Sequence, residues 1–231
     1  VEFFDSQYSA NQMGLVVLHN QTLDEMESWM VPMAMQIKDR QLPAYEVTEP
    51  LFVELPSVLT HQTLQENDLV RFSFPVPLLD PHYKTKPGDY IANLIGHEAK
   101  GSLHSALTER GWITWLSAAT RHVDNKTSLF LVNVGLTDDG KSRIPEITDL
   151  LFDYIALLRV EEPERWRFDE QAIVSNLGFR FQEEDAPIAT VSGLSPDLAT
   201  YPAEDLLIYP YMMTRFDASL IKSYTSLLTP E

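Results

Sequence analysis

Residues 128–158 read Ser-Leu-Phe-Leu-Val-Asn-Val-Gly-Leu-Thr-Asp-Asp-Gly-Lys-Ser-Arg-Ile-Pro-Glu-Ile-Thr-Asp-Leu-Leu-Phe-Asp-Tyr-Ile-Ala-Leu-Leu. The first part, Ser128–Leu136, consists mostly of apolar residues and predicts a strand. Thr137-Asp138-Asp139 then predicts a helix cap, and its carboxylates favour the positive end of the helix. The apolar residues that follow have the spacing of an amphipathic helix packed on a sheet. They are Ile144, Ile147, Leu150, Leu151, Tyr154, Ile155 and Leu158.

Further strands precede this strand and helix. Trp112–Arg121 and Ser128–Leu136 predict a hairpin whose turn contains Asp124-Asn125-Lys126. Upstream, apolar and polar residues alternate in Asn67–Val76, as in a strand with one buried face. Val58–Gln65 could form an additional strand.

Helices are predicted on both sides of the hairpin. Two short helices are expected near Asp89–Ile95 and Ser102–Glu109, and others after Pro163, Pro187 and Asp217. The apolar residues on one side of the helix after Pro163 are Trp166, Ile173, Leu177 and Phe181. This order of elements predicts an α+β fold, an antiparallel β-sheet with helices mainly on one face.

The first 50 residues have a different pattern. Residues 10–19 predict a buried strand, and Thr22 with Glu25 forms a capping box for a helix that runs to about Lys38. Residues 43–50 contain two prolines and no periodicity, which indicates a linker. The predicted division is 1–42, a linker at 43–50, and a domain at 51–231.

Composition excludes several classes of function. With 34 acidic and 17 basic residues the formal net charge is −17, whereas nucleic-acid binding needs a basic surface. The chain has no cysteine, and therefore no disulfide and no thiolate ligand or nucleophile. No apolar run reaches the roughly 18 residues of a membrane span.

A metal site is the first chemistry that the sequence suggests, because His97, Glu98 and His104 lie near one another. On one helix the two histidines would be roughly 10 Å apart along the axis, too far to share a zinc ion. Neither HExxH nor HxxEH occurs in the chain, and neither do the serine-hydrolase elbow or the common phosphate-binding loops. The residues therefore predict no zinc site and no catalytic centre in this segment.

Short motifs that carry a family resemblance occur in order along the chain. They are Arg71-Phe72-Ser73-Phe74-Pro75, Leu94-Ile95-Gly96-His97-Glu98, Arg110-Gly111-Trp112, Leu136-Thr137-Asp138-Asp139-Gly140, Trp166-Arg167-Phe168 and Tyr201-Pro202-Ala203-Glu204-Asp205. With these motifs, the chain resembles the insulinase/pitrilysin family of zinc metallopeptidases. The resemblance implies the insulinase/mitochondrial processing peptidase-like metallohydrolase fold.

The resemblance also implies a place for the chain in a longer protein. Residues 1–42 would be the last strand and helix of a catalytic domain, and residues 51–231 a second, inactive, substrate-binding domain. Zinc would be held by an HxxEH helix and a later Glu upstream of Val1, so the parent enzyme would contain zinc and this segment none. Its partners would be peptide substrates and the other domains of the same polypeptide.

In this family the second domain carries an exosite, which holds the amino terminus of a peptide away from the zinc. Carried over, its residues would be Gly96, His97, Glu98, Leu116, Ser117, Ala118 and Ala119. A peptide could add to this strand through main-chain hydrogen bonds, with Glu98 pairing with its ammonium group. Asn93 and the Ser117-Ala118-Ala119 run depart from the family pattern of a histidine and a glycine-rich run.

Three alternatives remain. Residues 96–98 could simply terminate a helix, or the parent could be a non-catalytic peptide-binding or scaffold subunit of the same superfamily. An independent hydrolase is the third. The family includes bacterial periplasmic and eukaryotic cytosolic members. Of these two compartments, the acidic, cysteine-free composition favours the periplasm.

Overall fold

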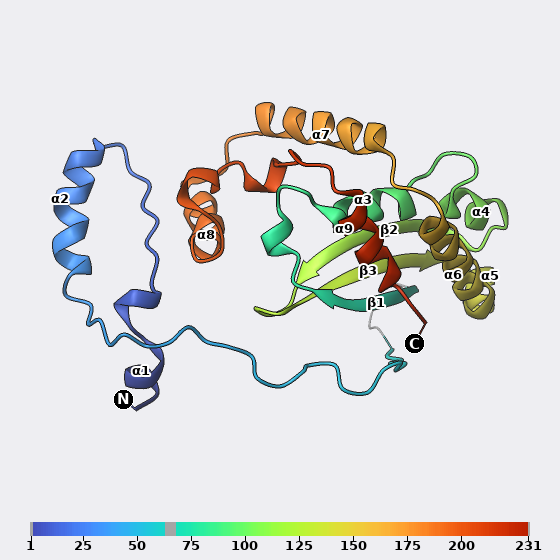
Figure 1. Ribbon diagram of the computed structural model, residues 1–231, viewed down its shortest axis with the longest axis horizontal. Helices are drawn as coiled ribbons and strands as arrows, with labels where there is room; N and C mark the ends of the chain where they lie inside the picture. Colours follow the sequence, from blue (N-terminus) through green and yellow to red (C-terminus); the bar gives the residue numbers. More distant parts are fainter. Residues whose placement is uncertain (1, 63–67, 231) are drawn as a thin grey trace. The chain divides into compact units, whose positions relative to one another are not determined.

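The computed structural model describes residues 2–62 and 68–230 (Figure 1). The chain divides into two compact units. Unit 1 comprises Val1–Glu46 with Gly178–Tyr211, and unit 2 comprises Val47–Leu177 with Met212–Glu231. Within the described ranges, no helix combines the length and the apolar character that a membrane crossing needs.

Unit 2 is built on a three-stranded antiparallel sheet. The strands are β1 (Leu69–Pro77), β2 (Ile113–His122) and β3 (Thr127–Leu136), in the order β1-β3-β2. Phe130 in the central strand is paired with Phe74 of β1 and Thr120 of β2. The predicted hairpin and the antiparallel sheet are therefore confirmed.

The two faces of this sheet differ in burial. Phe130, Val132 and Val134 alternate along β3 and are almost fully buried in the core. Apart from Gly135, which lies against Trp115, residues of the strands on the other face are partly or fully exposed, and Arg71 there donates a hydrogen bond from Nε to Oδ1 of Asn133 at 2.6 Å. Because side chains alternate between the faces of a strand, the core lies on one side of the sheet only.

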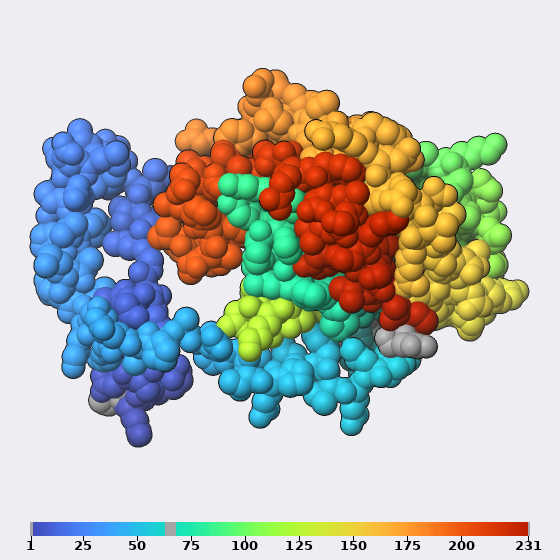
Figure 2. Space-filling view, in the orientation of Figure 1, coloured from blue at the N-terminus to red at the C-terminus, as the bar shows by residue number. Residues whose placement is uncertain are grey.

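Helices cover the buried face. They are α3 (Pro87–Ile95), α4 (Leu103–Glu109), α6 (Ile144–Val160) and α9 (Ala218–Ser226), whose apolar side chains join the core of the sheet. Helix α9 contacts both α3 and α6. Figure 2 shows the C-terminal helix, in red, beside the teal segment that leads into α3. This arrangement confirms the predicted α+β fold.

The helix predicted after Thr137 is interrupted. Thr137 caps a short helix, α5 (Asp138–Lys141), and α6 begins only at Ile144. Pro145 explains the break, because proline lacks the N–H that a continuous helix needs but fits the first turn of a new one. The buried side of α6 consists of Ile147, Leu151 and Ile155, all among the predicted apolar positions.

Helix α7 (Arg165–Arg180) begins close to the predicted proline. Its buried residue is Phe168, whereas the apolar side chains that the sequence places together on one side are exposed. These exposed side chains are Trp166, Ile173, Leu177 and, just after the helix, Phe181.

Unit 1 contains α1 (Glu2–Gln7), a 3-10 helix (Ala10–Gln12), α2 (Leu23–Ala34) and α8 (Pro187–Asp197), with two short 3-10 turns, Ala203–Asp205 and Tyr209–Tyr211. The capping box is confirmed, since Glu25 donates its backbone N–H to Thr22 Oγ1 at 3.3 Å and accepts the N–H of Thr22 at 3.1 Å. The helix ends before the predicted Lys38.

The buried strand predicted for residues 10–19 is wrong. After the 3-10 turn, residues 13–19 have no regular structure and are mostly exposed. A strand needs a hydrogen-bonded neighbour, and none of the described residues pairs with this segment as a strand. The possible strand Val58–Gln65 is also absent as far as residue 62, while residues 63–65, and Asn67 of the next predicted strand, lie outside the described ranges.

Candidate functional site

An open cavity of about 740 Å³ lies in unit 2 between the turn after α3 and strand β2. Every residue named from the sequence as part of a peptide-binding surface lines it. These are Gly96, His97, Glu98, Leu116, Ser117, Ala118 and Ala119. The structure thus places two segments that are separated in sequence by helix α4 on one surface.

The turn after α3 begins with Gly96 and lies against β2. Gly96 ends the helix and donates its N–H to Ala92 O at 2.8 Å. A β-carbon on Gly96 would lie 3.1 Å from Ala92 O, a tight contact within α3, and 3.7 Å from the backbone nitrogen of Ala118, an ordinary van der Waals distance. His97 and Glu98 follow with exposed side chains. The turn is therefore a helix terminus that also forms a wall of the cavity.

Strand β2 forms the opposite wall. It pairs with β3 on one side, and in the described part of the chain no strand pairs with its other side. Leu116 is buried in the core and anchors the strand, while Ser117 and Ala119 are exposed. An edge strand of this kind presents backbone N–H and C=O groups that another extended chain can pair with.

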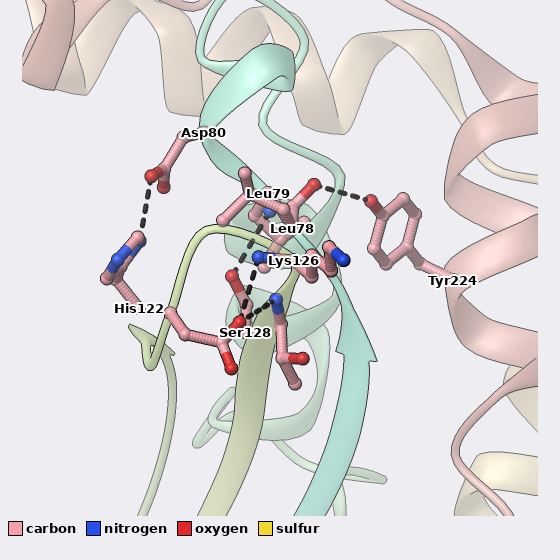
Figure 3. Close-up of polar contacts among 9 residues, drawn as sticks. Leu78, Leu79, Asp80, His122, Lys126, Ser128 and Tyr224 are labelled. Carbon is pink, nitrogen blue, oxygen red and sulfur yellow. Dashed lines mark hydrogen bonds and ion pairs between the residues drawn. The ribbon is translucent and has the colours of Figure 1, made fainter. Parts of the chain in front are cut away.

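Two sets of contacts hold β2 in position. On the open face, Ser117 Oγ accepts a hydrogen bond from Asn133 Nδ2 at 3.4 Å. At the far end of the strand, Nδ1 of His122 lies 2.8 Å from a carboxylate oxygen of Asp80 (Figure 3). Beside this contact, the hydroxyl of Tyr224 from α9 donates to Leu78 O at 3.2 Å, and burial raises the pKa of this phenol. The edge strand is thus tied through His122 to the segment before α3, and Tyr224 of α9 holds that same segment.

The cavity contains two carboxylates in different situations. Asp89 forms an ion pair with Lys86 at 3.4 Å. Glu98 is exposed and forms no ion pair with any described residue. An unneutralised carboxylate beside a free strand edge can pair with a cationic group, with the modest energy typical of exposed charges.

The residues that first suggested a metal site do not come together. His97 lies in the turn, whereas His104 is half-buried in α4 and does not line this cavity. In residues 2–62 and 68–230, no group of three His, Asp or Glu side chains could hold a metal ion. The donor set of these residues therefore does not fit zinc.

Several lining residues were not named from the sequence. They are Asp89, Ala92, Ala99 and Thr120, together with Asn93, which was named only as a departure from the family pattern. The helical spacing of Asp89, Ala92, Asn93 and Gly96 could have indicated them, because residues three and four apart share a helix face.

The chain is similar in sequence to known peptidases. A model described as the peptidase M16 inactive domain matches residues 1–173, and one described as the middle or third domain of peptidase M16 matches residues 179–231. The A-factor-processing enzyme of Saccharomyces cerevisiae is 30% identical over 236 residues, and the insulin-degrading enzyme of Homo sapiens is 31% identical over 233. Each alignment covers 100% of this chain.

The solved structure of pitrilysin has the same fold. It superposes with a TM-score of 0.91 over 99% of this chain, at 23% sequence identity. The chain spans 25% of pitrilysin and 23% of each of the two enzymes above.

Proposed function

The chain belongs to the peptidase M16 family, the insulinase family of metallopeptidases, and on that premise we propose that it is a non-catalytic, substrate-binding segment of an insulinase-like zinc metalloendopeptidase. In this proposal residues 1–42 complete a catalytic domain, 43–50 are a linker and 51–231 form a second domain. The parent enzyme degrades peptides in an enclosed chamber, and its zinc site lies upstream of this segment. The other domains of the polypeptide and peptide substrates are the partners.

One observation carries the proposal. The seven residues carried over from the family resemblance line a single cavity, and that cavity runs along the free edge of β2. A simple helix terminus at Gly96 would not require small side chains on the facing strand. Here Ser117, Ala118 and Ala119 keep the edge accessible to another backbone.

The mode of binding follows from these groups. A peptide adds to β2 as a further strand, and its main-chain hydrogen bonds give affinity without dependence on sequence. Its terminal ammonium group lies beside Glu98, which has no ion-pair partner among the described residues. The result is a site for the amino-terminal end of an extended peptide.

The test of the ammonium role compares a free peptide with its acetylated form. The probe is an extended 12-residue peptide with a fluorophore at its carboxyl end, and the dissociation constant for the 231-residue chain is measured by anisotropy. We expect Glu98→Gln to weaken binding of the free peptide about fivefold, the magnitude of an exposed ion pair, and to leave the acetylated peptide unchanged.

A matched variant controls for the loss of charge. Glu170 is exposed in α7, forms no ion pair with a described residue and lies outside the cavity. Glu170→Gln should therefore change neither affinity. Equal effects of Glu98→Gln on both peptides would count against the ammonium role.

The strand-addition mode has its own test. Backbone N–H groups of a docked strand point alternately toward and away from the neighbouring strand. N-methylation of every second peptide amide should therefore abolish binding in one register and preserve it in the other. Equal affinity of the two methylated peptides would contradict docking along β2.

A further inference from the structure

A second cavity, of about 710 Å³, adjoins the first. His97 and Ala99 line both, so the two cavities meet at the turn after α3. We propose that the second cavity is a subsite for the first side chain of the docked peptide and that it selects a large apolar side chain. This inference rests on the proposed function, because the peptide must first place its amino terminus beside Glu98.

The walls of the second cavity come from three helices. Helix α3 supplies Tyr90, Ile91 and Leu94, helix α6 supplies Tyr154, Leu157, Leu158 and Val160, and helix α9 supplies Ile221. These are aliphatic and aromatic side chains, which is the usual composition of a pocket for an apolar group.

The two phenols in the wall present their rings rather than unsatisfied hydroxyl groups. Tyr90 Oη accepts a hydrogen bond from the backbone N–H of Glu164 at 2.9 Å. Tyr154 Oη donates to Leu94 O at 3.1 Å. A phenol is already uncharged at neutral pH, and burial raises the pKa of both of these phenols further. A ligand gains little by offering them polar groups.

Apolar surface in this cavity also lacks cover. Leu157 is 52% exposed and Val160 is 79% exposed, although the same helix buries Ile147, Leu151 and Ile155 in the core. A side chain that removes this surface from water gains free energy in proportion to the apolar area buried.

The charges at the rim cancel one another. Glu164 pairs with Arg167 at 2.8 Å, and Glu162 pairs with Lys222. The remaining charged residues of the lining, Lys100 and Glu161, have opposite signs, and neither forms an ion pair with a described residue. The cavity therefore offers no single-sign field that would favour an acidic or a basic side chain.

The position of the subsite follows from the shared turn. Glu98, the proposed partner of the ammonium group, lies between His97 and Ala99 in sequence, and these are the residues common to both cavities. The first residue of a peptide docked there has its α-carbon bonded to the ammonium nitrogen. Its side chain consequently begins where the second cavity opens.

The experiment uses free-amino peptides that differ only in their first residue, Phe, Ala or Asp. We expect the 231-residue chain to bind the Phe peptide about tenfold more tightly than the Ala peptide, and the Asp peptide no better than the Ala peptide. Leu157→Ser should reduce the Phe-to-Ala ratio to about two by removing apolar wall.

Leu177→Ser is the matched control. Leu177 is 47% exposed in α7, close to the exposure of Leu157, and it lines neither cavity. This variant should keep the tenfold ratio. Because both positions are exposed, equal urea midpoints for the two variants would show that any difference in binding is not a difference in folding.

The outcomes separate the two proposals. Equal affinity for Phe and Ala peptides in the unmodified chain, or a tenfold ratio that survives Leu157→Ser, overturns the subsite while leaving strand docking intact. Equal affinity of the two N-methylated peptides, with the Phe preference retained, overturns strand docking instead. Absence of binding by all peptides overturns both.

Discussion

Replacing Gly88 with alanine should force helix α3 away from strand β2. Gly88 is buried in the first turn of α3. A β-carbon at this position would lie 2.4 Å from Cγ2 of Thr120 in β2 and 3.2 Å from Cδ1 of Leu79. Carbon atoms in contact prefer a separation of about 3.5–4.0 Å, so the contact with Thr120 is too short by about 1 Å.

The expected loss of stability combines two effects. Overpacking a core typically costs about 1–3 kcal/mol, whereas alanine is preferred over glycine within a helix by up to about 1 kcal/mol. Gly88→Ala should therefore lower the free energy of unfolding by about 1–2 kcal/mol. The physical cause is the methyl group of Thr120, because Leu79 is contacted only at the end of its side chain.

A compensating substitution tests that cause. Thr120→Ser removes the Cγ2 methyl and alone should cost about 1 kcal/mol of lost apolar burial. In the presence of Gly88→Ala it also removes the clash, so the double variant should be about 2 kcal/mol more stable than the sum of the single effects. Urea unfolding of the four proteins in a double-mutant cycle measures this coupling. Additivity within about 0.5 kcal/mol would refute the close packing of α3 on β2.

Two further predictions concern the hairpin and the start of α5. The pKa of the Asp124 carboxyl is lowered, chiefly by the backbone N–H of Lys126 and then by that of Thr127. The ionised carboxylate therefore stabilises the fold at pH values above the unfolded pKa near 4. This stability is lost as the pH falls through the lower folded pKa. The urea midpoints of the unmodified chain and of Asp124→Asn should therefore differ at pH 7 and converge as the pH falls below the unfolded pKa; a difference that does not change with pH would contradict this linkage. A β-carbon on Gly140 would lie 1.9 Å from the carbonyl oxygen of Trp112, so Gly140→Ala should cost about 3 kcal/mol in the same assay, and an unchanged midpoint would contradict the close approach.

Local signals were enough to predict much of unit 2 from the sequence. Alternation of apolar residues identified β1 because the sheet has one buried face, and the caps identified helix starts. Thr137 Oγ1 accepts the N–H of Gly140 at 3.0 Å, and Asp217 Oδ1 accepts the N–H of Leu220 at 3.0 Å. Each of these contacts joins residues three apart in the chain, so the local sequence is enough to predict it.

Non-local requirements explain the failures. The apolar run at residues 10–19 fits a strand, but a strand forms only where a neighbour offers hydrogen bonds. The side of α7 that carries Ile173 and Leu177 is periodic in sequence, yet the helix packs through Phe168. Periodicity indicates which residues share a face but not whether another element covers that face.

The candidate site was likewise only partly predictable from the sequence. The family resemblance, not spacing, brought residues 96–98 and 116–119 together before the structure was known. The second cavity could not be predicted, since its wall joins Tyr90, Leu157 and Ile221 from three helices far apart in the chain. Only the packing of α3, α6 and α9 on one another creates that surface.

The departure at Ser117-Ala118-Ala119 from a glycine-rich run affects the two faces of β2 differently. Side chains of a strand stand above and below the sheet, whereas a docked peptide approaches in the plane of the sheet. Ser117 and Ala119 point to the open face and leave that approach clear. Ala118 is paired with the buried Val132, so its β-carbon lies on the helix side, and its backbone nitrogen lies near Gly96. In the proposed docking mode the closest constraint on a peptide is therefore on the helix side, where a small residue of the strand lies near the turn.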